Sequence, residues 1–165
     1  MIDLILRPSN ENDADLFLSW LKDESEFDIL SGGTLGKMPH SGKELYDVFM
    51  SRSTTEKQYT VEYNGVPVGQ FTLRDAGDGC YKICYVIIDK NRRKEGLGRQ
   101  MMSLAVDYCL NELKAKNISL VVFKRNTAAF NCYKDVGFKV VEGKESMFML
   151  MGKEEACYEM IWYNK

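Results

Sequence analysis

An Asn-Gly pair between two stretches of alternating side chains is the feature that most constrains the fold of this chain. Asn64-Gly65 joins Tyr59–Tyr63 to Val66–Leu73. A type I′ turn needs positive φ at both central residues, which Asn and Gly tolerate, so the pair predicts a tight β-hairpin. A second turn, Asp75–Gly79, leads into Tyr81–Ile88, whose nearly continuous apolar side chains predict a strand buried on both faces. We therefore expect an antiparallel meander in the middle of the chain.

Helical periodicity surrounds this meander. Asn10 can cap one helix, and Ser41 with Glu44 forms a capping box for another, while Gly137 suits the end of a helix. The expected helices are 10–21, 41–52, 97–116 and 127–136, and the further strands are 4–7, 120–123, 138–141 and 157–163. Residues 22–40 are expected to form a loop, and 142–156 have no clear assignment. The order predicts an α/β (α+β) mixed sheet, mostly antiparallel, with helices on its faces.

Length and composition limit the possible functions. With 165 residues, positions 1–165 are expected to form one domain. The net charge of −2 gives no overall field for binding nucleic acid or an anionic membrane, and no apolar run is long enough to span one. Five cysteines without a Cys-x-x-Cys pair, and no leader segment, favour reduced thiols and a cytoplasmic location. The single histidine, His40, excludes a His₂ or His₃ metal site, and we expect no metal.

A basic, glycine-containing turn, Arg93–Gly98, lies between the apolar strand and the longest helix. The first N–H groups of a helix have no intrahelical partner, and the helix dipole adds partial positive charge there. Glycines at Gly96 and Gly98 allow several N–H groups to approach one anion, and Arg99 adds positive charge. This pattern predicts a phosphate or pyrophosphate site, although a plain loop has the same appearance in isolation.

The two common phosphate-binding motifs do not fit this turn. A P-loop would need Gly-x₄-Gly-Lys-Ser/Thr, which the sequence lacks. A dinucleotide fingerprint would need a third glycine where Met101 stands. Both motifs also follow the first strand of their fold, whereas this turn follows a hairpin and a further strand.

Two blocks of sequence resemble the GNAT N-acetyltransferase family. The segment 88–98 resembles the family's acetyl-CoA turn, Arg/Gln-x-x-Gly-x-Gly/Ala, although Lys90 stands where the family often has Pro. About thirty residues later, 126–138 matches Asn-x-x-Ala-x-x-x-Tyr-x-x-x-Gly-Phe. The resemblance is weakest over 22–56 and 142–156. It implies the GNAT fold, with a six- to seven-stranded sheet and about four helices, and acetyl transfer from acetyl-CoA to a primary amine of a small molecule, peptide or protein.

The resemblance also implies a set of site residues. The main chain of the turn would hold the CoA pyrophosphate, and the arm of the cofactor would enter between the strand at Val86–Ile88 and the strand at Leu120–Phe123. Tyr133 would lie near the thioester sulfur as the catalytic acid, since a phenol can protonate a departing thiolate. Without the resemblance, Tyr133 would be taken as an ordinary core residue. The implied cofactor-binding residues are Val86, Ile87, Ile88, Arg93, Lys94, Glu95, Gly96, Leu97, Gly98, Arg99, Asn126 and Ala129.

The acceptor and the general base are left open. Glu62, Asp75 and Asp78 are conceivable bases, but each also reads as a solvated strand or turn residue. The acidic segment 23–28 would attract a cationic amine if it lines the acceptor groove, and it could equally be a solvated surface. A methionine-rich segment, Met147–Met151, favours one more core strand over an acyl pocket or a subunit contact. A monomer or homodimer is expected, and the rival function is a non-catalytic acyl-CoA sensor.

Overall fold

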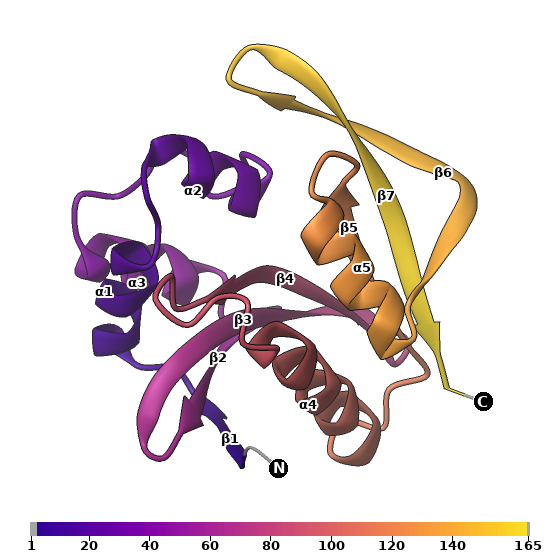
Figure 1. The fold of residues 1–165 in the computed structure, drawn as a ribbon, viewed down its shortest axis with the longest axis horizontal. Coiled ribbons are helices and arrows are strands. Elements are labelled where there is room, and N and C mark those ends of the chain that lie inside the picture. Colours follow the sequence, from indigo (N-terminus) through magenta and orange to yellow (C-terminus); the bar gives the residue numbers. More distant parts are fainter. Residues whose placement is uncertain (1–2, 165) are drawn as a thin grey trace.

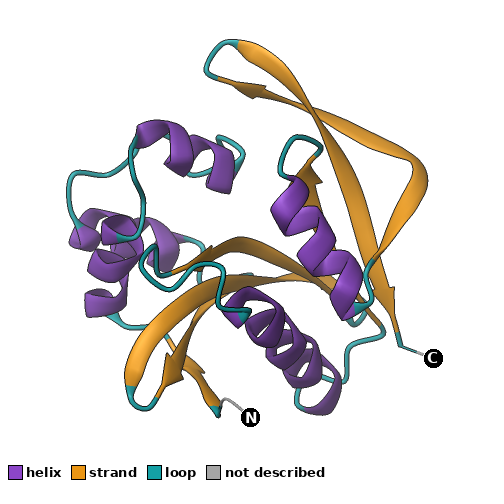
Figure 2. Ribbon diagram, in the orientation of Figure 1, coloured by secondary structure: helices purple, strands orange, loops and turns teal. Residues whose placement is uncertain are grey.

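The computed structural model describes residues 3–164 as one mixed sheet with helices on both faces (Figures 1 and 2). The seven strands lie in the order β1-β2-β3-β4-β5-β7-β6, and every neighbouring pair is antiparallel except β4–β5. The strands are β1 (Leu4–Pro8), β2 (Glu56–Tyr63), β3 (Val66–Gly77), β4 (Cys80–Ile88), β5 (Asn117–Phe123), β6 (Lys139–Leu150) and β7 (Lys153–Tyr163). The helices are α1 (Glu11–Ser19), α2 (Glu24–Ser31), α3 (Gly42–Ser51), α4 (Leu97–Asn111) and α5 (Thr127–Val136). The predicted fold class is confirmed, with one helix more than expected.

The local signals of the sequence act as predicted with one exception: Glu44 accepts from His40 N–H and does not complete the expected capping box with Ser41. Asn64 and Gly65 have φ of 52° and 75° and close the β2–β3 hairpin. The side chains of Asn10 and Ser41 cap α1 and α3, and Gly137, at φ 115°, ends α5. Each of these residues fixes a few neighbouring backbone angles, which is why sequence alone locates them.

Part of the segment predicted to be a loop, 22–40, is the helix α2. The Asp23 side chain accepts from the main-chain N–H of Glu26 and caps the helix, and Gly32 ends it at φ 59°. Phe27, which is fully buried, attaches α2 to the core formed with α1 and α3. The prediction was wrong because eight residues with an acidic first turn show no clear apolar periodicity.

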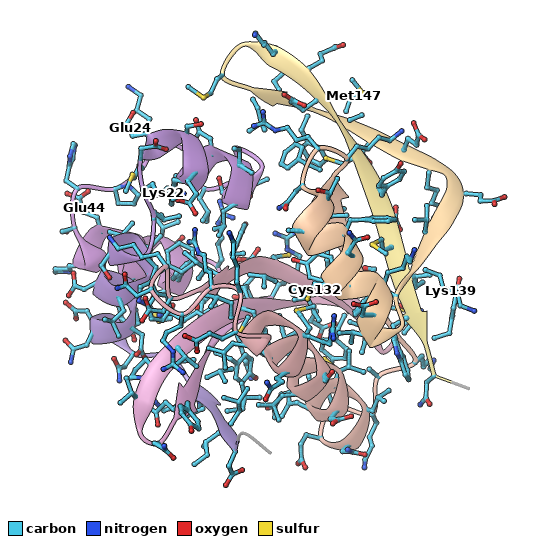
Figure 3. The ribbon with its side chains drawn as sticks, in the orientation of Figure 1. Lys22, Glu24, Glu44, Cys132, Lys139 and Met147 are labelled. Atoms are coloured by element: carbon cyan, nitrogen blue, oxygen red, sulfur yellow. The ribbon has the colours of Figure 1, made fainter. Side chains whose placement is uncertain are left out.

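The unassigned segment 142–156 belongs to two long strands. β6 and β7 continue through it as a hairpin that turns at Met151 and Gly152, both at positive φ, and projects beyond the rest of the sheet (Figure 1). The preference for a core strand at Met147–Met151 is wrong, because Met147, Met149 and Met151 are 56%, 61% and 70% exposed (Met147 is labelled in Figure 3). Only Leu150 of this run is buried.

Two further expectations need correction. The long helix ends at Asn111 rather than Lys116, because the chain turns at Lys114, which has φ 54°, and Ala115 N–H donates back to Cys109 O. β4 is not buried throughout: alternate residues such as Val86 and Ile88 are only half-buried. The open space beside them is the cleft described below.

The helices divide between the two faces of the sheet. Phe71 and Leu73 of β3 pack in one core with residues of α4 and α5. Gln70 points the other way and donates to the main-chain oxygen of Asp13 in α1 at 2.6 Å. The α1–α3 group therefore covers the face opposite α4, with its own core. No helix among residues 3–164 is long and apolar enough to cross a bilayer.

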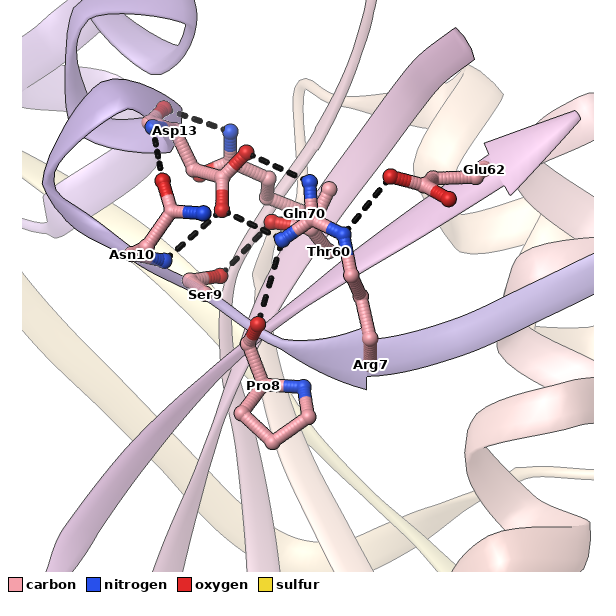
Figure 4. Close-up of polar contacts among 8 residues, drawn as sticks. All are labelled: Arg7, Pro8, Ser9, Asn10, Asp13, Thr60, Glu62 and Gln70. Carbon is pink, nitrogen blue, oxygen red and sulfur yellow. Dashed lines mark hydrogen bonds and ion pairs between the residues drawn. The ribbon is translucent and has the colours of Figure 1, made fainter. Parts of the chain in front are cut away.

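An ion-pair network fixes α1 to the sheet (Figure 4). Arg7 of β1 donates to both carboxylate oxygens of Asp13, at 2.6 and 2.9 Å, and to Glu62 of β2 at 2.6 Å. Burial alone would raise the pKa of Asp13, but the hydrogen bonds from Arg7 and from the Asn10 main chain outweigh it, so the pKa is lowered. The network orients the helical layer that covers one side of the cleft.

Candidate active site

The sheet opens between its two parallel strands. β4 and β5 pair only at Cys80–Asn117, Tyr81–Ile118 and Lys82–Ser119. Beyond Lys82 their facing edges have no ladder hydrogen bonds to one another, while the outer edges remain paired with β3 and β7. The separation leaves main-chain donors and acceptors of 83–88 facing a gap, as the family resemblance implied for the cofactor arm.

A bulge at Tyr85 turns β4 away from β5. The β3–β4 register shifts between Gln70–Ile87 and Thr72–Cys84, and Tyr85 has a φ of 51°. A non-glycine residue at positive φ needs support from its surroundings. Here the Tyr85 hydroxyl lies 2.8 Å from Thr34 Oγ1 and accepts from Arg52 Nη1 at 3.2 Å. The side chain thus holds the bulge from the α1–α3 face.

One continuous cleft of about 770 Å³ runs through this gap. Its walls come from α2, β4, the turn before α4, the first residues of α4, β5 and α5, and from Phe148 of the β6–β7 hairpin. The hairpin closes one side, since Phe148 packs edge-on against Phe123, in a cluster against which Ile29 of α2 also packs. Of the predicted site residues, all but Glu95 line this cleft.

The turn before α4 presents main-chain amides to one end of the cleft. Lys94 and Gly96 have φ of 67° and 78°, and no side chain caps the helix. Among the described residues, the first amide of the helix that finds a main-chain acceptor is Gln100, which donates to Gly96 O at 3.3 Å. Amides in alternating right- and left-handed conformations, at the positive end of a helix dipole, form a concavity whose electrostatics favour an anion.

The arginine side chains of the turn are used by the protein itself. Arg93 donates to Trp20 O at 3.0 Å and Ile88 O at 3.3 Å, and it pairs with Glu26 at 2.8 Å. Arg92 similarly pairs with Glu95 at 2.8 Å. The contacts of Arg93 attach the turn to α1 and α2, whereas the Arg92–Glu95 pair lies within the turn itself. Glu95, paired with Arg92, is exposed to solvent and does not line the cleft.

Gly98 leaves space in the cleft that the protein does not fill. A Cβ built at this position would lie 3.8 Å from Cys132 Sγ and 3.9 Å from Ile88 Cγ1, both ordinary contacts. The neighbouring protein atoms therefore do not demand glycine at Gly98. Leu97 beside it is buried in the core below the sheet, and Arg99 pairs with Asp135 of α5.

Tyr133 reaches the cleft from α5. Its side chain is 9% exposed, and the ring meets Phe138 edge-on with centroids 6.3 Å apart. In the described part of the chain only Glu56 Oε2 and Gln58 Nε2 are fully buried polar atoms without a partner, so the unpartnered Tyr133 hydroxyl is open to the cleft. Burial, and to a smaller extent Cys132, raises the pKa of the phenol above 10.0, which keeps it protonated at neutral pH.

The remaining predicted residues have mixed surroundings. Asn126 accepts from Ala129 N–H at 3.2 Å, so its side chain caps α5 while also facing the cleft. Ala129 lines the cleft one helical turn before Tyr133. Val86 and Ile88 line the gap half-buried, and Ile87 is buried toward the α1–α3 core. Cys132, labelled in Figure 3, lies between α4 and α5, and burial raises its pKa, which makes it a poor nucleophile.

None of the three conceivable bases lines the cleft. Glu62 is bound to Arg7, Asp75 accepts from Gly77 N–H, and Asp78 lies in the β3–β4 turn. Of the acidic segment 23–28 only Glu26 faces the cleft, and it is paired with Arg93.

Sequence reasoning missed residues that build the site from outside the two blocks. Asp89 organises the turn, since its side chain accepts from Asn91 N–H at 2.9 Å and its main chain from Arg92 N–H at 2.8 Å. An Asp whose side chain can accept from the N–H two residues later is a local turn signal that could have been used. Arg74 and Lys82 also line the cleft, but only strand pairing brings them there.

Comparison with known proteins agrees with this geometry. The sequence profile described as the acetyltransferase (GNAT) family matches residues 14–138. A search of curated proteins finds no match. Among solved structures, spermidine N-acetyltransferase from Vibrio cholerae in complex with CoA and spermine superposes with a TM-score of 0.80 at 20% identity, over 97% of this chain and 95% of that one. A chimera of the Vibrio cholerae enzyme SpeG and hSSAT gives a TM-score of 0.79 at 20% identity, over the same shares.

A sequence identity of 20% with these solved structures shows a shared fold. The family profile shows more, because it covers most of the chain, including both sequence blocks and every predicted residue that lines the cleft. The chain therefore belongs to the GNAT acetyltransferase family and is an acetyl-CoA-dependent N-acetyltransferase.

Proposed function

We propose that the cleft holds acetyl-CoA through the amides of residues 94–99 and that Tyr133 is the general acid for transfer of the acetyl group to a primary amine. One observation carries the proposal: unpartnered amides at the head of α4 and an unpartnered phenol line the same cleft, which passes between β4 and β5. Along this cleft the amides suit an anion, the open edge of β4 suits an extended polar chain, and the phenol suits a leaving group that needs a proton.

The residues present fit the cofactor in three ways. A pyrophosphate suits the amide concavity, and the space above Gly98 admits it. The unpaired edge of Val86–Ile88 can hydrogen-bond an extended amide-containing arm in the manner of an added strand. Asn126 and Ala129 form the facing wall.

The chemistry would then depend on one proton. Acetyl-CoA supplies, when bound, a thioester whose acyl carbon is open to attack by an amine. The Tyr133 hydroxyl would donate its proton at the sulfur as the carbon–sulfur bond breaks and the carbon–nitrogen bond forms. The phenol is suited to this step because its raised pKa keeps it protonated and because no protein acceptor competes for its proton.

The proton that the attacking amine releases would be accepted by water. The one cleft-lining carboxylate on the α2 side, Glu26, is already paired with Arg93, and Glu62, Asp75 and Asp78 lie elsewhere. We therefore propose no side chain of the described residues as the base.

A thermal-shift panel with CoA, acetyl-CoA, ATP and NAD tests the cofactor. A ligand at about 100 times its Kd stabilises a protein by about 2.7 kcal/mol, so CoA and acetyl-CoA should raise the Tm by several degrees while ATP and NAD do not. A shift with ATP or NAD alone would contradict the proposal.

Release of free CoA in the presence of amines tests the reaction. Polyamines belong in that panel, because proteins of the same fold act on spermidine, together with aminoglycosides and peptide N-termini. Binding of CoA without turnover of any amine would favour the non-catalytic sensor instead.

A further inference from the structure

The charges on the walls of the cleft do not suit a polycation. Among residues 3–164, only two carboxylates line it, Glu26 and Asp135, and each is already paired with an arginine, Arg93 and Arg99. The cationic side chains that line the cleft are Arg74, Lys82, Arg92, Arg93, Lys94 and Arg99. No cleft-lining carboxylate among residues 3–164 therefore remains free to hold an ammonium group.

Two of these cations lie far from the amide concavity. Arg74 of β3 and Lys82 of β4 are direct partners in the strand register, so their side chains leave the sheet on the same face. That face is the one covered by α1–α3, since neighbouring Cys84 packs with the core of those helices. The phosphates of a cofactor held before α4 would lie at the other end of β4, near Ile88, and would not neutralise this pair.

The protein neutralises this end only in part. Glu56 pairs with Arg74 at 2.8 Å and lies 4.0 Å from Arg52, so one carboxylate serves two guanidinium groups. Lys82 makes no ion pair within the described residues, yet it is half-buried in the cleft wall. Like charges directly opposite on neighbouring strands are destabilising, so an uncompensated pair here is a cost that an anionic ligand would remove.

We propose that Arg74 and Lys82 bind an oxyanion of the acceptor, so that the substrate is a primary amine that also carries a carboxylate or phosphate. The proposal rests on the proposed function. Tyr85, where the bulge lies and the cleft passes through the sheet, is three residue steps along β4 from Lys82. Three steps of a strand span about 10 Å, which is the separation expected between the oxyanion and the acetyl-accepting nitrogen.

The test compares three acceptors that differ only in their far end: ω-aminooctanoate, ω-aminooctanamide and diaminooctane. The wild-type kcat/KM should be highest for the carboxylate. Lys82→Gln should lower it about 10- to 100-fold for the carboxylate, the usual effect of a charge-assisted hydrogen bond, and leave the amide unchanged. ω-Aminooctyl phosphate in place of the carboxylate shows which oxyanion is preferred.

Lys82 is the better position to vary because Arg74→Gln would leave Glu56 buried with a weakened partner. Lys57→Gln is the matched control, since Lys57 is exposed and neighbours Glu56, so its side chain leaves the opposite face of the sheet. Lys82→Glu should reverse the order of the acceptors in favour of diaminooctane.

Calorimetry on the complex with CoA separates this inference from the proposed function. Binding of ω-aminooctanoate that Lys82→Gln weakens, without any turnover, would support the oxyanion site and contradict the enzyme mechanism. Turnover in which diaminooctane or spermidine exceeds the carboxylate, equal loss with all three acceptors in Lys82→Gln, or no binding of the carboxylate would overturn the oxyanion site.

Discussion

Replacing Tyr133 by phenylalanine removes one oxygen atom from the cleft wall and changes little else in the fold. The hydroxyl has no hydrogen-bond partner among residues 3–164, and the edge-on contact of the ring with Phe138 would remain. The free energy of unfolding should therefore change by less than about 1 kcal/mol. Affinity for CoA should also be unchanged, because the amide concavity is untouched.

Turnover should respond very differently. A positioned general acid contributes about 10²- to 10⁴-fold to a rate, so kcat of Tyr133→Phe should fall by that factor. The assay is steady-state release of free CoA, with CoA affinity measured separately by calorimetry. Tyr158→Phe is a suitable control, because Tyr158 is a half-buried tyrosine of β7 that packs at a tilt against Phe130 and does not line the cleft.

The pH profile adds an independent check. An acid must be protonated to act, and burial raises the pKa of Tyr133 above 10.0. Ionisation of this group should therefore not reduce wild-type kcat below about pH 10. Unchanged kcat in Tyr133→Phe, or a loss of CoA affinity as large as the loss of kcat, would refute the reasoning and return Tyr133 to a packing role.

Two further perturbations address the anion site and the helical layer. Gly98→Ala should keep the wild-type Tm, since its Cβ would meet only ordinary contacts with the protein, but it should weaken CoA binding at least 10-fold because the Cβ occupies the space above the amides. Wild-type affinity would show that the phosphates lie elsewhere. Asp13→Asn should lower the free energy of unfolding, measured with urea at pH 7, by about 2 kcal/mol. The loss should not be larger, because Arg7 would still pair with Glu62 and is partly exposed to solvent. Because the pKa of Asp13 is lowered in the folded state, this stabilisation of the wild type is present above about pH 4 and is lost as the pH falls through the folded-state pKa. An Asp13→Asn variant with the same acid unfolding transition as the wild type would contradict this account.

Much of the fold was determined by short-range signals in the sequence. Asn64 and Gly65 closed the predicted hairpin, Asn10 and Ser41 capped the predicted helices, and Gly137 ended α5. The glycine-containing turn before α4 was predictable for the same reason, since the glycines and the start of the helix are adjacent in the chain. Such features depend on the backbone angles of a few consecutive residues, and sequence reports these directly.

The tertiary structure decided which residues surround each of these local features. Arg93 looked like a phosphate ligand, yet contacts with Trp20 and Glu26 turn its side chain inward. Arg74 and Lys82 carry no motif, and they form one positive end of the cleft only because β3 and β4 pair in this register. Pairings between distant segments depend on how the whole chain packs, so no local pattern of residues could reveal them.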